Sequence, residues 1–268
     1  MLAVVGVIIR KIKDKIYADV NKHFDLKLND KIVLKTEHGI EVGMVFEKLK
    51  SIHNNENSTS KVLRKITESD EKIIENNEIK NIKVKKVIIK KIEEHKLNMK
   101  LTSVQYTFDR SKLFIYYTSE IRVDFRKFIK DLGSILKTRI QMVQIGVRDE
   151  SKIVGGIGPC GRIVCCHNFL KDFNSITIDI AKDQNLLLNT AKLTGLCGRL
   201  LCCIFYESDT YKNIKKKLPT LGNIVLTPNG KAKLIAIDCI RERVTVDFGD
   251  NKPFEIFKID QITSINKK

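Results

Sequence analysis

Short apolar runs rich in β-branched residues at both ends of the chain predict β-strands. Turn signals such as His38-Gly39 and Pro228-Asn229-Gly230 separate them. The N-terminal runs cover 4–9, 32–34 and 41–46, and the C-terminal runs cover 223–227, 231–240, 243–248 and 254–259. Since short strands with close turns favour small closed sheets, we expect a β-rich, barrel-like unit at each end.

The middle of the chain changes to helical spacing. Apolar residues fall near one face over 61–76, where Ser60 could cap a helix, and over 79–97. Strands are then expected at 104–108 and 113–117, with a four-residue hairpin loop between them, and at 139–145. The best helix is expected at 125–136, where apolar residues recur at i, i+3, i+4, i+7, i+10 and i+11, and its stripe is interpreted as core.

These elements predict an α+β fold with four parts. The polar stretch 51–60 is interpreted as a linker. The parts are an N-terminal β-rich unit (1–50), an α+β unit (61–147) with the order α-α-β-β-α-β, a cysteine-repeat region (148–213) and a C-terminal barrel-like unit (214–268). The sequence therefore predicts a chain of several small units and no single large core.

The net charge of +17 over 268 residues suggests a polyanionic partner, nucleic acid or an acidic protein. An equally weighted alternative is a Lys-, Ile- and Asn-rich composition that reflects an AT-rich genome. Residues 79–100 hold eight lysines and two glutamates, whereas 151–213 hold seven basic and five acidic residues. We therefore expect any basic surface on 79–97 and the terminal β units, and a nearly neutral cysteine region.

The apolar opening at 1–9 is too short to span a bilayer and lacks the features of a signal peptide. The sequence thus predicts a cytoplasmic protein without membrane insertion, in which cysteines stay reduced.

One heptapeptide pattern, Cys-Gly-Arg-x-x-Cys-Cys, occurs twice, at 160–166 and at 197–203, and each copy follows a glycine two residues before its first cysteine. Thiolates are the ligands preferred by zinc and by iron–sulfur clusters. The candidate cofactor and metal ligands are the six cysteines of the repeat: Cys160, Cys165, Cys166, Cys197, Cys202 and Cys203.

Neither copy easily supplies four converging thiolates, because the side chains of adjacent cysteines diverge. Each copy is expected to offer its leading cysteine and one of its Cys-Cys pair, so that two copies packed together bring Cys160 and Cys197 to a shared site. Arg162 and Arg199 would offset thiolate charge, against the alternative of surface ion pairs. His167 is left out as a ligand since the second copy has Ile204 there. Two alternatives to an iron–sulfur cluster are a zinc site and a buried core of cysteines that binds no metal.

Gly156-Ile-Gly-Pro-Cys-Gly161 formally matches a dinucleotide-binding motif, but a charged segment, not a strand, precedes it. No phosphate loop, zinc-protease helix, nucleophile elbow or kinase signature occurs in the sequence.

Longer stretches around the repeat resemble the RicT (YaaT) family, which carries the polymerase-suppressor-type C-terminal domain. They are 155–170, 181–185, 193–203, Val123-Asp-Phe-Arg126 and Gln144-Ile-Gly-Val-Arg-Asp-Glu150. The resemblance covers roughly 60–220 strongly and the β-rich ends weakly, and it implies a bacterial cytosolic regulator that is not an enzyme. It implies a [4Fe–4S] cluster bound through the six repeat cysteines.

The resemblance also implies partners: small helical proteins of the RicA and RicF type, in a complex that works with the endoribonuclease RNase Y in mRNA maturation and affects sporulation, competence and biofilm formation. RNA is a further candidate partner. The competing interpretations are a zinc- or thiol-structured nucleic-acid-binding protein and a redox enzyme, for which no substrate motif is found.

Overall fold

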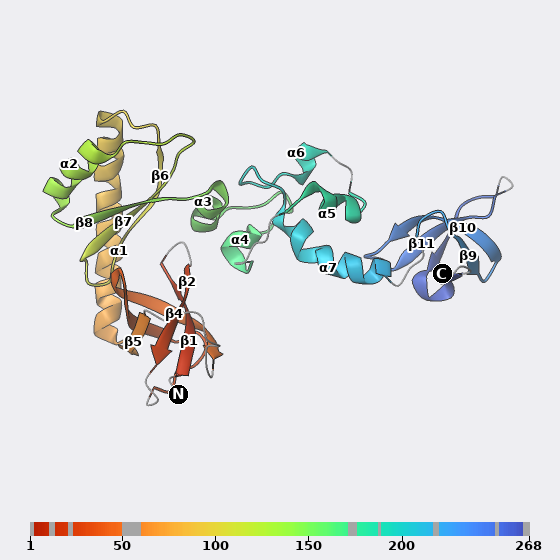
Figure 1. Ribbon diagram of the computed structural model, residues 1–268, viewed down its shortest axis with the longest axis horizontal. Helices are drawn as coiled ribbons and strands as arrows, with labels where there is room; N and C mark the ends of the chain where they lie inside the picture. Colours follow the sequence, from red (N-terminus) through yellow and green to blue (C-terminus); the bar gives the residue numbers. More distant parts are fainter. Residues whose placement is uncertain are drawn as a thin grey trace. The chain divides into compact units, whose positions relative to one another are not determined.

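The computed structural model describes residues 3–10, 14–20, 24–49, 60–170, 176–186, 189–216, 220–249 and 252–264. The chain divides into two compact units, residues 1–171 and 172–268. Unit 1 contains a closed barrel and a three-stranded sheet with helices, and unit 2 contains short helices and a five-stranded sheet (Figure 1). The predicted α+β fold with β-rich units at both ends is confirmed.

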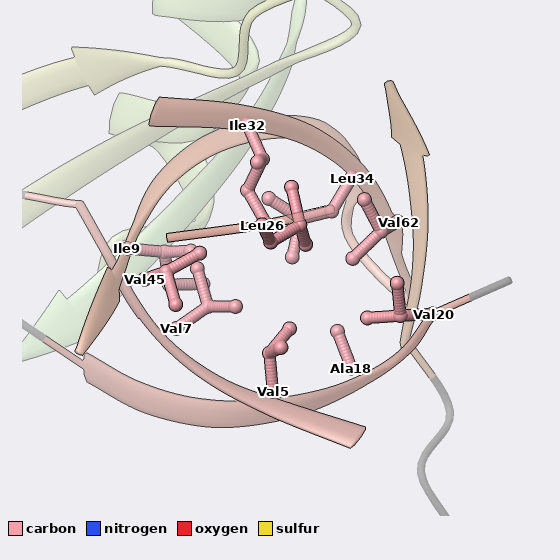
Figure 2. Packing of buried hydrophobic residues seen from close by; sticks show 10 residues of the cluster. All are labelled: Val5, Val7, Ile9, Ala18, Val20, Leu26, Ile32, Leu34, Val45 and Val62. Atoms are coloured by element: carbon pink, nitrogen blue, oxygen red, sulfur yellow. The ribbon is translucent and has the colours of Figure 1, made fainter. Parts of the chain in front are cut away.

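The N-terminal barrel closes in the order β1-β2-β5-β3-β4. Its strands are β1 (Ala3–Ile9), β2 (Asp14–Val20), β3 (Lys31–Thr36), β4 (Gly39–Leu49) and β5 (Ser60–Lys65). Figure 2 shows the interior, where small aliphatic side chains from all five strands and Leu26 meet. Because every second residue of a strand points inward, β-branched residues at alternate positions fill this narrow space.

The prediction of a helix from 61 to 76 is wrong for its first residues. Ser60 starts a strand rather than capping a helix, and Val62, only 1% exposed, packs in the barrel interior. Strand β5 pairs antiparallel with β3 and parallel with β2, and so completes the barrel. Tertiary pairing therefore outweighs a helical spacing that rested on few residues.

A single long helix, α1 (Glu68–Glu94), replaces the two helices expected at 61–76 and 79–97. Thr67 and Asp70 form a capping box at its start. Asn77 and Asn81 lie on its buried face, where the Asn77 side chain donates to the Phe108 carbonyl and Asn81 accepts from the Tyr106 N–H. These two polar residues interrupt the apolar spacing of the helix, which is why one helix was predicted as two. Their side chains are stable in the interior because each forms a hydrogen bond there.

Helix α1 lies along a sheet of order β6-β7-β8, made of β6 (Lys100–Tyr106), β7 (Lys112–Thr118) and β8 (Arg139–Gln144) (Figure 1). The expected hairpin and the expected helix are confirmed, the latter as α2 (Arg126–Leu136). Phe128 and Leu132 of α2 pack with Ile88 of α1 in one core. The apolar stripe of α2 is core, as predicted.

Strand β7 is buried on both faces, because the barrel and α3 (Val147–Val154) cover the face away from the long helix. The Arg10 guanidinium lies 4.0 Å from the ring centroid of Phe114 and bonds Glu41, 2.9 Å from Nε to Oε1. Burial raises the pKa of the Glu41 carboxyl, and Arg10 opposes that rise. The Phe108 N–H also donates to the Ile40 carbonyl. Barrel and sheet are thus joined by both apolar and charged contacts.

Unit 2 begins with α5 (Ile178–Asp183), α6 (Thr190–Leu193) and α7 (Cys202–Lys216). The sheet that follows has the order β12-β11-β10-β9-β13. Its strands are β9 (Ile224–Thr227), β10 (Gly230–Asp238), β11 (Arg243–Asp247), β12 (Glu255–Lys258) and β13 (Thr263–Ser264), with a 3-10 turn, η1 (Ile259–Gln261), before the last. The core of this sheet is aliphatic, with Leu234 and Val246 fully buried. Among the described residues, no helix combines the length and hydropathy needed to cross a membrane.

Candidate functional site

The first cysteine motif folds as a tight hairpin that leads into a helix. The N–H of Gly158 donates to the Arg162 carbonyl (N···O 2.8 Å), and the N–H of Gly161 donates to the Gly158 carbonyl (2.9 Å). Cys160 therefore lies in the turn of the hairpin. Cys165 is the first residue of the following helix, α4 (Cys165–Asn168).

The second motif repeats this backbone geometry 37 residues later. The N–H of Gly195 donates to the Arg199 carbonyl (2.8 Å), and the N–H of Gly198 donates to the Gly195 carbonyl (2.9 Å). Cys197 lies in the turn, and Cys202 is the first residue of α7. The repeat seen in the sequence is thus also a repeat of main-chain structure.

Further equivalent contacts close both hairpins. A β-bridge joins Ile157 to Ile163 in the first copy and Thr194 to Leu200 in the second. The residue before the Cys-Cys pair then donates back to the chain before the hairpin: Val164 N–H to the Gly156 carbonyl, and Leu201 N–H to the Leu193 carbonyl, at 3.1 and 2.9 Å. These contacts fix the position of the leading cysteine in space relative to the Cys-Cys pair of the same copy.

The glycine after each leading cysteine is required by the backbone. Gly161 has φ 75° and Gly198 has φ 73°, in the left-handed region that disfavours a side chain. The first glycine of each hairpin lies under the leading sulfur: a Cβ placed on Gly158 would lie 3.6 Å from Cys160 Sγ, and one on Gly195 would lie 3.9 Å from Cys197 Sγ. Both sulfurs therefore fold back over the hairpin in the same way.

The six repeat cysteines differ in exposure. Cys160 is exposed, Cys166 is buried, and the other four are half-buried. All seven cysteines lie in the described residues, and none of them forms a disulfide. Cys239, outside the repeat, is buried, and that burial raises the pKa of its thiol. Its position agrees with the interpretation of Cys239 as a core residue.

The thiols suit a soft metal by their chemistry, but no single unit gathers a complete ligand set. In neither unit do three Cys, His, Asp or Glu side chains of the described residues converge as a metal ion requires. The first motif belongs to unit 1 and the second to unit 2. The expectation that Cys160 and Cys197 approach a shared site therefore stays a prediction. Four-thiolate ligation needs thiols from more than one motif, supplied by the other copy or by another protein.

Arg162 and Arg199 contribute their main chains to the hairpins and expose their side chains to solvent. Neither guanidinium forms an ion pair with a described residue. The alternative interpretation, that each arginine serves in a surface ion pair, therefore has no partner in the described part of the chain. Two positive charges beside the cysteine turns remain available to a thiolate site.

The residue after each Cys-Cys pair connects its motif to the surrounding structure. In the first copy His167 Nδ1 donates to the Lys152 carbonyl at 2.9 Å, which ties α4 to α3. In the second copy Ile204 is 4% exposed and packs with Ala181 and Leu193. The hydrogen bond at Nδ1 does not involve Nε2, so the exclusion of His167 from the ligand set stays a prediction.

The helices that begin at the two cysteine pairs, α4 and α7, were not predicted from the sequence. The buried Gln184 donates its side-chain amide to the Ile204 carbonyl and so fixes the start of α7 against α5. Apolar residues at 201, 204 and 205 have helical spacing and are the sequence signal for α7.

Two family models match the chain: the PSP1 C-terminal conserved region over residues 60–145, and the PSP1-like protein third domain over residues 175–218. The stage 0 sporulation protein YaaT of Bacillus subtilis is 45% identical over 91% of this chain and 89% of its own length. This chain belongs to the YaaT family of PSP1-type proteins.

Two fungal proteins are similar to parts of this chain. An uncharacterized protein of Schizosaccharomyces pombe, PB7E8.02, is 29% identical over 49% of this chain, and Protein PSP1 of Saccharomyces cerevisiae is 48% identical over 19% of it. The chain spans only 22% and 6% of those two relatives. No solved structure matches the chain. The resemblance inferred from the cysteine motif is thus confirmed as a YaaT relationship.

Proposed function

We propose that this protein is a cytoplasmic, non-enzymatic regulator that binds a [4Fe–4S] cluster and acts as an adaptor of RNase Y in mRNA processing. The observation that carries the proposal is the doubled hairpin–helix, in which identical hydrogen bonds place a cysteine in a turn and a second one at a helix start. A buried cysteine core would need small apolar side chains, not the same main-chain device twice.

The residues that would hold the cluster are Cys160, Cys165, Cys166, Cys197, Cys202 and Cys203. When bound, such a cluster supplies a redox-sensitive, structure-forming centre. The chain's own residues supply the donors, the glycine turns that orient the leading sulfurs, and Arg162 and Arg199 as compensating charges. Since no motif alone offers four thiolates, partners of the small helical RicA and RicF type are proposed to complete or stabilise the ligation.

The regulatory part of the proposal rests on relationship. The Bacillus subtilis relative is named for stage 0 of sporulation. We propose the same process for this chain, with competence and biofilm formation as further outputs of altered transcript processing.

Metal analysis after anaerobic purification tests the cluster. The chain purified together with its helical partners should contain iron and acid-labile sulfide in equal amounts, and Cys160→Ser and Cys197→Ser should each lose most of both. Cys239→Ala, which removes a buried thiol outside the repeat, is the matched control and should keep its iron. Zinc without sulfide in the wild-type chain would overturn the cluster and favour the zinc-structured nucleic-acid-binding alternative.

A second measurement tests the adaptor role. Transcript ends mapped in cells that carry only Cys160→Ser should show the same loss of RNase Y-dependent ends as cells without the gene. Wild-type processing in cells lacking the gene would exclude the adaptor role whatever the metal content.

A further inference from the structure

The long helix α1 presents an apolar stripe on the face opposite its core. Val84, Ile88 and Ile92 face the sheet, while Ile79, Ile82 and Ile89 are 54%, 57% and 41% exposed. Three large aliphatic side chains exposed along one line of one helix are unusual for a surface without a binding role.

The exposed stripe has the spacing of a coiled-coil seam. Counting by alternating steps of four and three residues gives 75, 79, 82, 86, 89 and 93, all of which are exposed. Isoleucine occupies three of these positions, Lys86 one, and Glu75 and Glu93 the two ends. The helix is 27 residues long, about 40 Å at 1.5 Å per residue, so the seam can accommodate several turns of a second helix.

The charge in the middle of this seam, between its acidic ends, has one sign. Residues 79–92 contain six lysines and no acidic residue. Lys83, Lys86 and Lys90 are exposed, and none of them forms an ion pair with a described residue. Lys85, by contrast, is half-buried and donates to the Thr102 carbonyl at 2.9 Å, so it belongs to the core side. A partner helix that covers the isoleucines would bring its flanking residues beside uncompensated lysines.

We propose that the outer face of α1 is a docking site for an acidic amphipathic helix of another protein. Such a helix would cover Ile79, Ile82 and Ile89 with an apolar stripe and place carboxylates beside Lys83, Lys86 and Lys90. The inference deepens the proposed adaptor function and rests on it for the existence of a protein partner. It concerns residues outside the cysteine motifs, and its test needs no iron.

A second copy of this chain fits the face less well. In a parallel pair Lys86 would face Lys86. An antiparallel pair centred at residue 84 would match Ile79 with Ile89 of the other copy. It would also place Lys86 against Ile82 and bring Lys83 and Lys86 of the two copies together, and this repulsion opposes a stable dimer.

RNA also fits less well. Single-stranded nucleic acid is bound by cations together with aromatic side chains on which bases stack. Helix α1 contains no aromatic residue, and aliphatic side chains lie among the lysines. A protein helix uses both features of the face, whereas RNA uses only the charge.

The test is a binding measurement with defined peptides. A fluorescein-labelled four-heptad peptide with Leu at the seam and Glu at the flanking positions should bind the full chain at physiological salt. A peptide with Lys at the flanks and one with Ala at the seam should bind at least about tenfold more weakly, since charge and burial each contribute to affinity.

Two variant sets assign the binding to α1. Ile79→Ser, Ile82→Ser and Ile89→Ser together, and Lys83→Glu, Lys86→Glu and Lys90→Glu together, should each weaken binding of the Glu peptide by at least about tenfold. Matched controls should keep wild-type affinity: Ile224→Ser with Ile256→Ser in unit 2, and Lys127→Glu with Lys130→Glu on α2. Unchanged circular dichroism and unfolding temperature establish that the variants fold, as expected for exposed positions.

Three outcomes would overturn the proposal. Equal binding of the Glu and Lys peptides, or of the wild type and both variant sets, removes the docking site. A dimer in sedimentation equilibrium that the isoleucine variant abolishes, without peptide binding, assigns the face to a second copy. Binding of a labelled single-stranded RNA that depends on the lysines but not the isoleucines, without peptide binding, assigns it to RNA. Loss of iron in the cysteine variants with intact peptide binding separates this site from the cluster.

Discussion

In the first cysteine motif the helix that begins at Cys165 is four residues long, whereas in the second the helix that begins at Cys202 is fifteen residues long. The hairpins before them have the same hydrogen bonds. The first copy is held through His167 and the Lys152 carbonyl, and the second through buried Ile204 and Gln184. Local backbone geometry is therefore set by the motif itself, and the surroundings are built differently for each copy.

This difference has a consequence for stability. A hairpin fixed by glycines and short-range hydrogen bonds can be kept in two places without the same core around it. Substitutions inside the hairpin should then change the local stability of both copies equally. Substitutions in the residues that pack against the hairpin should change it unequally.

The largest difference is expected at the position after the Cys-Cys pair. Ile204→Ala should destabilise the region around α7 by about 2–5 kcal/mol, because it leaves a cavity between α5 and α6. His167→Ala should cost only about 1 kcal/mol, since it removes one hydrogen bond. Hydrogen exchange resolved by segment measures both, with exposed Ile224→Ala as the control for apolar loss. Equal effects at 167 and 204 would show that the two copies are held alike.

A smaller difference is expected at Gln184. Gln184→Ala should raise exchange over 202–210 by the equivalent of about 1–3 kcal/mol, because the buried Ile204 carbonyl loses a donor. Exchange over 155–170 should not change. Gln144→Ala, which removes an exposed amide bond to the Ser119 carbonyl, is the matched control and should have little effect. Unchanged exchange in α7 would mean that this bond does not hold the second copy.

The smallest difference between the two copies is expected inside the hairpins, where their costs should agree. Gly161→Ala and Gly198→Ala should each cost about 1–2 kcal/mol locally, since alanine is strained at positive φ. Nothing lies within 4 Å of an added Cβ at either position, so the cost is conformational rather than steric. Gly133→Ala, in helix α2 with similarly open space, should be neutral or slightly stabilising. Unequal costs at 161 and 198, by local exchange, would contradict the equivalence of the hairpins.

The sequence predicted what depends on local pattern. The strong stripe of α2, the hairpin of β6 and β7, and the β-rich ends follow from periodicity and turn residues. The cysteine spacing located the motif pair, yet the shared hydrogen bonds at Gly158 and Gly195 emerge only from the folded backbone.

What the sequence missed depends on contacts between distant residues. Asn77 appeared to interrupt a helix, but Phe108 and Arg110, more than 30 residues away, satisfy its side chain in the interior. Lys85 counted as one of several surface lysines until its bond to Thr102 was known. Strand β2 starts with two charged residues and has no regular alternation, so its signal was too weak to be recognised.

The closing strand of the barrel has a consequence for how this protein can be divided. Strand β5 lies within the region 60–145 that matches the PSP1 family, yet it pairs with β2 and β3, which precede that region. A fragment that stops before residue 60 would leave two open sheet edges, and open edges invite aggregation. A descendant that inherited only the family region would carry a strand without its neighbours. A truncated form of this chain should therefore keep the first 65 residues together, or replace the partner strands of β5.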